Sequence, residues 1–402
     1  MRIVLAYFEK FIEMSGGIER VCCNMANAMS ARGHDVSIVY CYGRSGMPFY
    51  SLDPSVKLYN LMEEAHPDQW KNPSLGQCVS GLDKVVREGL RIFSKSAARD
   101  WNESCKGRMI EKEIQHTFDA IYPDVIVSFR YETSNYMLHF AHVKAPVITM
   151  FHMSPDFILP DAPTGELKAI AESARAQVLL KRDIPVVERF CPGARVVWIP
   201  NAVPQYEEKA DLGKEKKTYT IINAARLNKP QKRQHLLVEA FAKVAGDYPN
   251  WRVELWGGGN DSGASYAEEL REQIRKNHLE SQVFLKGEST HIIDEYTKAD
   301  IFCFPSAYEG FPLAMTEAMS AGLPVVGFKS CTAVADLIDN GKNGILTDDG
   351  ADALARGLTF LMDSKEKREE IGEQARASMK DYAPEKIWNM WEQLLNEVVS
   401  DE

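Results

Sequence analysis

Residues 2–41 read RIVLAYFEKFIEMSGGIERVCCNMANAMSARGHDVSIVYC. The run Arg2–Tyr7 is apolar without polar alternation, which is typical of a parallel strand buried on both faces. In Ile18–Arg32 the apolar residues recur at helical spacing, and Gly33 follows where a helix C-cap is expected. Val36–Cys41 is a second apolar run, so the stretch predicts a βαβ unit.

The alternation of short apolar runs and amphipathic stretches continues along the chain in two series. The first series has further apolar runs at Asp124–Phe129, Pro146–Phe151 and Arg195–Ile199. The second has apolar runs at Thr218–Asn223, Arg252–Trp256, Gln282–Leu285, Asp300–Phe304 and Pro324–Phe328, with helical segments at Gln234–Ala245, Tyr266–Asn277 and Leu313–Ala321. Between the series, Gln205–Lys217 is polar and rich in Lys and Glu, which predicts a linker.

Two such series predict an α/β protein with two doubly wound, Rossmann-like domains. We place the N-terminal domain at residues 1–204 and the C-terminal domain at 205–383, followed by a helix within 384–402. Ligands of doubly wound sheets bind at the carboxyl ends of the strands, so we expect the two domains to face each other across a cleft. Leu61–Arg99 and Asp156–Arg182 do not fit the series, and the first of them is expected to be an insertion in the N-terminal domain.

The composition narrows the class of protein. The chain has 402 residues, of which 45% are hydrophobic and 26% charged, as expected for a soluble protein of two domains. A net charge of -10 argues against a general nucleic-acid binder. We find neither a signal peptide nor an apolar run near the roughly 20 residues that span a bilayer. The 8 cysteines form no Cys-x-x-Cys pair, which favours reduced, buried thiols in a cytoplasmic protein.

A pair of glycines, Gly16 and Gly17, stands between the first strand and the first helix. Glycines let backbone N–H groups approach a ligand closely, and a helix N-terminus attracts an anion. The pair is therefore a candidate phosphate-binding loop. The alternative is a tight turn between strand and helix.

Two basic residues follow the first strand of the second series. Arg226 stands at its end and Lys232 lies six residues further on, before the helix that starts at Gln234. A guanidinium and an ammonium suit a diphosphate, whose negative charge grows as it leaves. The alternative is two solvated surface cations, and Lys229 and Arg233 compete for the same role.

A third candidate is the stretch 304–319, FPSAYEGFPLAMTEAM. A strand ends at Phe304, a glycine-containing loop follows, and a helix begins near Pro312. We expect Glu309 in the loop and Glu317 in the helix to point toward one ligand, because carboxylates accept hydrogen bonds from sugar and ribose hydroxyls. The N–H groups that we expect to face the same space, at the helix start, are those of Gly310, Phe311 and Leu313.

His152 follows the apolar run Pro146–Phe151, at another carboxyl end. A single histidine is often structural. Because this one is expected to face the cleft, a functional role and a structural role have equal weight.

Taken in order, these motifs resemble those of the retaining glycosyltransferases of the family 4 type, which share the two-domain architecture called GT-B. The resemblance covers nearly the whole chain and is carried by the ordered set Gly16-Gly17, Trp198–Val203 (WIPNAV), Arg226 with Lys232, Trp256–Gly259 (WGGG), Glu309 and Glu317 as a Glu-x7-Glu motif, and Thr332–Ile338 (TAVADLI).

The resemblance implies a role for each matched residue. The donor diphosphate would be held by Gly17, Arg226 and Lys232. The transferred sugar would meet Glu309 and the loop after it, which comprises Gly310, Phe311, Pro312 and Leu313. Glu317 would bind the ribose, and His152 would lie against the donor sugar. It also implies retention at the anomeric carbon, no metal or other cofactor, and a C-terminal helix that crosses back to the first domain.

The implied activity is transfer of a sugar from a UDP- or GDP-sugar to a glycan or lipid-linked acceptor, in polysaccharide or cell-envelope glycan biosynthesis. We identify no residue that must act as a covalent nucleophile, so charge stabilisation and orientation are expected to dominate. Two departures from the family pattern are Ala202 in place of a glycine and Ser330–Ala333 in place of a Gly/Pro-rich turn, which leaves the donor contacts of that loop open.

The acceptor side is less marked. Residues 84–99 hold five basic residues and one acidic residue, with Val86, Leu90, Phe93 and Ala97 on one helical face. Such a helix fits contact with an anionic membrane surface, on the inner face of the membrane, or an ordinary solvated surface. From their position after a strand, the acceptor is expected near Arg130, Tyr131 and Asn135.

Three other functions remain in view. One is a nucleotide-sugar epimerase, which shares the architecture. Another is a non-catalytic sugar-nucleotide binder. The glycosyltransferase is distinguished from such a binder if Glu309→Ala abolishes turnover while nucleotide binding is retained. A nicotinamide-dependent dehydrogenase is disfavoured, because Gly257–Gly259 would need a further glycine where Ser262 stands.

Overall fold

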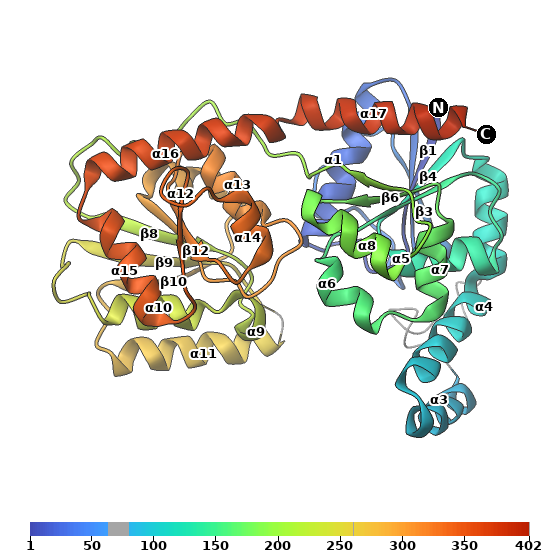
Figure 1. The fold of residues 1–402 in the computed structure, drawn as a ribbon, viewed down its shortest axis with the longest axis horizontal. Coiled ribbons are helices and arrows are strands. Elements are labelled where there is room, and N and C mark those ends of the chain that lie inside the picture. Colours follow the sequence, from blue (N-terminus) through green and yellow to red (C-terminus); the bar gives the residue numbers. More distant parts are fainter. Residues whose placement is uncertain (63–79, 260, 402) are drawn as a thin grey trace. The chain divides into compact units, whose positions relative to one another are not determined.

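The computed structural model describes residues 1–62, 80–259 and 261–401. The chain divides into two compact units (Figure 1). The first comprises Met1–Pro200 and Ile387–Glu402, and the second comprises Asn201–Lys386.

The first unit is built on a seven-stranded parallel sheet of order β3-β2-β1-β4-β5-β6-β7. The chain moves outward from β1 in one direction and from β4 in the other, so the strand order reverses between them. Its strands are β1 (Arg2–Tyr7), β2 (Asp35–Tyr40), β3 (Lys57–Asn60), β4 (Val125–Ser128), β5 (Val147–Met150), β6 (Arg175–Val178) and β7 (Val196–Trp198).

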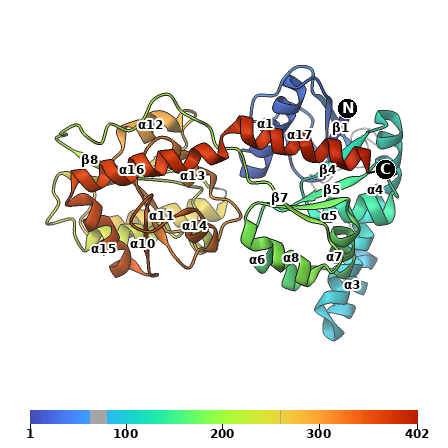
Figure 2. The ribbon, with the colours of Figure 1, turned by 45° about the horizontal axis from the view of Figure 1, so that its top comes forward.

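Helices surround this sheet. They are α1 (Gly17–Ala31), α3 (Gly81–Phe93), α4 (Lys95–Ile121), α5 (Tyr131–Asn135), η2 (Tyr136–Phe140), α6 (Pro155–Ile158), η3 (Leu159–Asp161), α7 (Thr164–Glu172), η4 (Lys181–Asp183), α8 (Ile184–Phe190) and α17 (Pro384–Ser400). On one face, Val4 and Ala6 of β1 pack in a core with Ile110, Ile114 and Phe118 of α4. The α17 helix lies beside α1, where Glu392 bonds to His34 just after the end of α1 (Figure 2).

The predicted end of the first helix is confirmed. Gly33 has φ +84° and donates its N–H to the Ser30 carbonyl, while the His34 N–H bonds to Met29. Glycine adopts this left-handed conformation without steric cost, which explains why the helix stops there.

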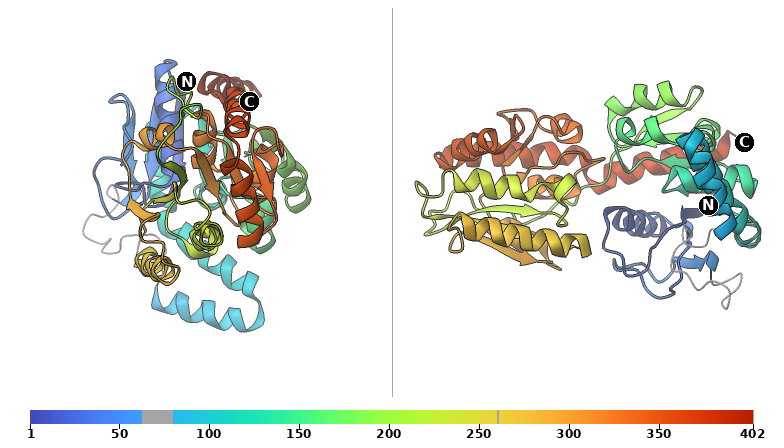
Figure 3. Two further views of the ribbon diagram at one scale, coloured as in Figure 1. Left: turned by 90° about the vertical axis from the view of Figure 1, so that its left-hand side faces the viewer. Right: turned by 90° about the horizontal axis from the view of Figure 1, so that it is seen from below.

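The basic segment 84–99 is not one helix. The α3 helix ends at Phe93 and α4 begins at Lys95, with the extended residue Ser94 between them capping α4 through the Ala97 N–H at 3.2 Å. A serine side chain stabilises a helix start, which favours the break here. Figure 3 shows α3 beside the first turns of α4, away from the sheet. Of the expected insertion Leu61–Arg99, residues 63–79 lie outside the described part of the chain.

The segment 156–182 belongs to the α/β series after all. It contains α7 and the strand β6, whose polar Arg175 and Gln177 hide its strand character. Gln177 is completely buried, and its side-chain amide donates to the Ile199 carbonyl. The short strands β3 and β13 were likewise not predicted.

The second unit is built on a six-stranded parallel sheet of order β10-β9-β8-β11-β12-β13, which reverses between β8 and β11. Its strands are β8 (Tyr219–Ala224), β9 (Trp251–Trp256), β10 (Val283–Gly287), β11 (Ile301–Phe304), β12 (Val325–Phe328) and β13 (Ile345–Thr347). Its helices are α9 (Lys229–Lys232), α10 (Gln234–Ala242), α11 (Asp261–Lys276), α12 (Ile292–Lys298), α13 (Leu313–Ser320), α14 (Thr332–Leu337), α15 (Ala351–Met362), α16 (Lys365–Met379) and η5 (Lys380–Tyr382).

Both units are thus doubly wound and Rossmann-like, which confirms the predicted α/β fold class. Within the described ranges, every helix is too short or too polar to cross a membrane.

Candidate functional site

The clearest cluster of predicted residues lies where the strand order of the second sheet reverses. Arg226 follows β8, and the loop 305–312 follows β11. Ligands of doubly wound sheets bind at such a switch point. The short helix α9 is tied to this loop, because the Ala307 N–H donates to the Gln231 carbonyl at 2.7 Å and the Gln231 amide donates to the Tyr308 carbonyl at 3.2 Å.

Lys232 and Glu309 form an ion pair in this cluster, with Nζ and Oε1 2.5 Å apart. Their side chains are only 13% and 9% exposed. The ammonium also lies 5.3 Å from the centre of the Phe304 ring. Two poorly solvated charges stabilise each other here, and an ammonium with three donors is able to bind a second anion at the same time.

Lys232 differs from the nearby Lys229 and Arg233 in its ion-pair partner. Lys229 pairs with Glu269, and Arg233 pairs with Asp349 at 2.8 Å. Both acids are exposed surface residues outside the predicted site. Lys232, by contrast, pairs with a predicted site residue.

Arg226 is exposed, and its backbone is held in place by the ends of two elements. Its carbonyl accepts from the Gln234 amide at 3.0 Å, and the next N–H, that of Leu227, donates to the Gly258 carbonyl at 2.8 Å. Gly257 has φ +139°, and a Cβ there would lie 2.0 Å from the Ala225 carbonyl oxygen. Only glycine fits this close approach, so Trp256–Gly259 positions the segment that carries Arg226.

The loop after Glu309 makes more contacts within the protein than expected. Phe311 is buried and its ring centre lies 5.7 Å from that of Tyr382. The Leu313 N–H donates to the Phe311 carbonyl at 2.9 Å, which differs from the expectation that it faces a ligand. Pro312 has no N–H and stands at the N-cap of α13, while Gly310 precedes it in the loop. Glu317 lies within α13 and is 3% exposed.

Gly16 and Gly17 belong to the first unit, at the start of α1. A Cβ on Gly16 would lie 2.0 Å from Oε2 of Glu19, a buried carboxylate that accepts a hydrogen bond from the Tyr7 hydroxyl at 3.0 Å. A phosphate bound at these glycines would therefore meet a negative charge beside the helix N-terminus, which differs from the expected anion-binding loop.

His152 follows β5 in the first unit, and its ring stacks on Phe129 with centres 5.2 Å apart. Its Nε2 atom is buried without a hydrogen-bond partner among the described residues. Burial and, next, the charge of Arg130 lower the pKa of His152 to about 3. The imidazole is therefore neutral near pH 7 and suited to hydrogen bonding rather than to acid catalysis.

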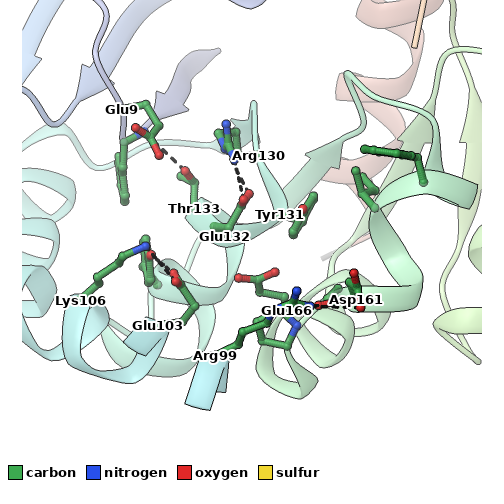
Figure 4. A pocket seen from close by; sticks show the side chains of 16 residues that line it. Glu9, Arg99, Glu103, Lys106, Arg130, Tyr131, Glu132, Thr133, Asp161 and Glu166 are labelled. Carbon is green, nitrogen blue, oxygen red and sulfur yellow. Dashed lines mark hydrogen bonds and ion pairs between the residues drawn. The ribbon is translucent and has the colours of Figure 1, made fainter. Parts of the chain in front are cut away.

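The first unit contains a pocket of about 430 Å³ that no motif of the sequence indicates (Figure 4). It contains Arg130 and Tyr131, as expected for the acceptor side, but Asn135 is buried outside it and bonds to His139 at 2.8 Å. Its lining also includes Phe8, Glu9, Arg99, Glu103, Lys106, Glu132, Thr133, Tyr136, Phe157, Ile158, Asp161, Ala162, Pro163 and Glu166. Half of the charged members come from α4 and α7, where no strand end marks them in the sequence.

No group of three or more His, Cys, Asp or Glu side chains that could hold a metal ion occurs among residues 1–62, 80–259 and 261–401.

Comparison with known proteins gives a match to the family model of glycosyl transferases group 1 over residues 204–378. An exopolysaccharide phosphotransferase of Streptomyces coelicolor is 28% identical over 96% of this chain, and the chain spans 40% of that relative's length. The amylovoran biosynthesis glycosyltransferase AmsD of Erwinia amylovora is 24% identical, with 96% of this chain and 97% of that protein covered.

Among solved structures, a mutant of S. aureus TarM in complex with fondaparinux, α-GlcNAc-glycerol and UDP has a TM-score of 0.74 and 16% identity, covering 98% of this chain and 100% of that one. At this identity the likeness concerns the fold. Residues 204–378 are therefore similar to glycosyl transferases group 1, and the likeness to solved structures extends over the fold of nearly the whole chain.

Proposed function

We propose that this protein is a retaining glycosyltransferase of the family 4 type that moves a sugar from a nucleotide-sugar donor to a glycan or lipid-linked acceptor. The observation that carries the proposal is the part-buried Lys232–Glu309 pair at the switch point of the second sheet, with Arg226 at the end of the neighbouring strand. This arrangement joins cations for a diphosphate to a carboxylate for a sugar hydroxyl.

In the proposed complex, Arg226 and Lys232 bind the diphosphate of the donor. They stabilise the negative charge that develops on it as the bond to the sugar breaks. Lys232 stays close to Glu309 while it contacts a phosphate oxygen, so the pair fixes the sugar and its leaving group together. We propose a UDP-sugar as donor, with a GDP-sugar as the alternative, and no metal ion; the UDP bound to TarM supports the first choice.

The remaining predicted residues complete the donor site in this proposal. Glu317 accepts hydrogen bonds from the ribose, and the backbone of Gly310 contacts the transferred sugar. Neutral His152 accepts or donates a hydrogen bond at the donor sugar through its unpaired Nε2. Gly17 meets the diphosphate provided that the Glu19 carboxylate moves away, because the two negative charges repel each other.

We also propose a role in polysaccharide or cell-envelope glycan synthesis, which the amylovoran relative supports, and a location at the inner face of the membrane. The membrane contact would be α3, on which Ile92 is 82% and Phe93 90% exposed. Lys84, Arg87 and Arg91 lie on the same helix, although both arginines are close to Glu88. An exposed apolar face beside basic residues is typical of helices that bind anionic membranes.

A turnover screen tests the proposed activity. The full chain is incubated with UDP-, GDP-, ADP- and CMP-sugars in the presence of a chelator, and release of the nucleotide is measured. We expect hydrolysis of one donor class, reduced at least about tenfold in Arg226→Ala and Lys232→Ala because a charge-assisted contact is lost. Lys229→Ala is the matched control, since it removes a cation of the same helix that pairs with Glu269.

Two further results would separate the alternatives. Loss of turnover with retained nucleotide binding in Glu309→Ala supports catalysis over mere binding. The anomeric configuration of the product, read by proton NMR, tests retention. Binding of a nicotinamide cofactor without binding of any sugar nucleotide would overturn the proposal.

A further inference from the structure

The pocket of the first unit lies at the switch point of its own sheet. Phe8 and Glu9 follow β1, and Arg130 to Thr133 follow β4. These are the two strands between which the strand order reverses. By the same rule that places a ligand at β8 and β11 in the second unit, this pocket is the expected binding site of the first.

The cations of the pocket are already paired within it. Arg130 binds Glu132 at 2.5 Å, and Lys106 binds Glu103 at 2.8 Å. Arg99 lies 3.3 Å from the Asp161 carboxylate. Figure 4 shows these pairs around the cavity. A ligand phosphate or carboxylate that approached one of these cations would also meet the carboxylate already paired with it, and repulsion between the two anions would offset the attraction.

Two acids of the pocket are not part of these three ion pairs. Glu9 stands exposed after β1, and Glu166 of α7 is 2% exposed. Among the described residues, neither carboxyl group has a hydrogen-bond or ion-pair partner. A carboxyl group that lines a cavity without a protein partner leaves its hydrogen-bonding capacity to a ligand, so the site favours a ligand that supplies hydrogen bonds.

Glu166 is neutral near pH 7. Burial, followed by the charges of Glu132 and Glu103, raises the pKa of Glu166 to about 9, while Lys106 and Arg130 oppose the rise. A protonated carboxyl group both donates and accepts a hydrogen bond, which matches a hydroxyl group of a sugar.

Aromatic side chains add an apolar surface to the pocket. Tyr131 lines it, and Phe157 is more than half exposed. A volume of about 430 Å³ lies within the usual range of small-molecule sites. Polar groups that fix hydroxyls, together with aromatic faces for the C–H groups of a ring, suit a carbohydrate.

We propose that this pocket binds the acceptor through a sugar ring that carries hydroxyl groups but no phosphate or carboxylate, and that Glu166 determines this specificity. The proposal rests on the proposed glycosyltransferase function and names the acceptor class for it. Neutral hydroxyl groups bond to Glu166 and Glu9 without disturbing the three ion pairs. An anionic sugar finds each cation of the pocket already beside a carboxylate, so its own charge gains little attraction there.

Saturation-transfer NMR on the full chain tests this proposal. The probes are the methyl glycosides of glucose, galactose and mannose, with methyl glucuronide and glucose 6-phosphate as anionic counterparts. We expect at least one neutral glycoside to bind, and the anionic probes to bind at least about tenfold more weakly, as for one unfavourable buried charge contact.

Variants locate the binding. Glu166→Leu should weaken the neutral glycoside about tenfold because it removes the hydrogen-bonding group, whereas Glu166→Gln should retain most of the binding. Glu172→Gln is the matched control, because Glu172 lies at the end of the same helix and pairs with His139 outside the pocket. Equal binding of anionic probes, no binding of any neutral glycoside, or no effect of Glu166→Leu would overturn the proposal.

Nucleotide-sugar hydrolysis by the same preparations keeps the two proposals separate. The acceptor proposal fails alone if wild type hydrolyses a donor but binds no neutral glycoside. The glycosyltransferase function fails if no donor is bound or hydrolysed, whatever the glycosides do.

Discussion

At the scale of single residues, Glu166 shows how burial changes the chemistry of a carboxyl group. It lies in a pocket with Glu132, Glu103, Lys106, Arg130 and Tyr131. The two acids add to the effect of burial and the two cations offset part of it. The folded protein therefore holds a proton on Glu166 that the unfolded chain releases.

This makes stability depend on pH. The pKa of Glu166 rises from 4.5 to about 9 on folding, so its favourable contribution is complete below about pH 4.5 and is lost as pH rises toward 9. Glu166→Gln removes this titration, so the variant should gain at least about 1 kcal/mol over wild type between pH 5 and pH 9. Urea denaturation at pH 5, 7 and 9 measures it. Parallel stability curves for the two proteins would contradict the assigned proton.

Gly257 is a second residue with a specific consequence. Because a Cβ would collide with the Ala225 carbonyl and the φ of +139° is unfavourable for other residues, Gly257→Ala should displace the Arg226 segment. We expect a stability loss of about 1–3 kcal/mol and weaker donor binding. Gly246→Ala, where a Cβ meets nothing within 4 Å, is the control for denaturation and nucleotide titration. Unchanged donor binding in Gly257→Ala would show that this glycine does not position Arg226.

At the scale of elements, one buried arginine caps the C-terminal end of a helix in the second unit. Arg368 of α16 is 3% exposed and donates to the Leu361 and Met362 carbonyls at 2.7 and 3.1 Å, at the end of α15. Its guanidinium also lies 5.2 Å from the Trp251 ring centre. It thus satisfies carbonyl groups that a helix end leaves unpaired.

Replacing this arginine should destabilise the second unit. Arg368→Met keeps much of the side-chain volume but leaves both carbonyls buried without a donor, so we expect a loss of about 2–4 kcal/mol. Arg356→Met, on the same pair of helices but not buried, is the control for urea denaturation. Equal midpoints for the two variants would mean that the capping contributes nothing.

The exposed face of α3 yields a prediction about membranes. Ile92→Ser combined with Phe93→Ser should reduce co-sedimentation with phosphatidylglycerol vesicles severalfold, because the apolar part of the contact is removed. Phe360→Ser, which changes an exposed aromatic residue of the second unit, should leave it unchanged. If wild type fails to bind these vesicles, or the α3 variant binds them as well as wild type, the membrane contact is wrong.

At the scale of the whole molecule, the parallel sheets were largely predictable. A strand buried on both faces must be apolar throughout, which is why Arg2–Tyr7 was predicted with the bounds that β1 has. The strand β6 was not predicted, because its buried Gln177 bonds to the backbone of a later loop, a contact that no local pattern reveals. The end of α3 at Phe93 escaped because helical spacing continues across Ser94, whereas its side chain starts a new helix.

The candidate residues divide in the same way. Arg226, Lys232 and Glu309 follow strands, and the order of parallel strands brings such positions to one edge of a sheet. Glu309 pairs with Lys232 rather than with Lys229 or Arg233. This choice depends on the turn of α9, which the sequence pattern does not reveal. Glu166 lies on a helix, and its proximity to Glu132 and Glu103 follows only from tertiary packing.

The most direct test of the central claim is a calorimetric titration of UDP, GDP, ADP and CMP into the full chain, with a chelator present. The account predicts that one nucleotide binds to wild type and to Lys229→Ala with similar affinity, and at least about tenfold more weakly to Lys232→Ala. Equal affinity in Lys232→Ala, or no binding of any of the four nucleotides to wild type, would contradict a donor site at the Lys232–Glu309 pair.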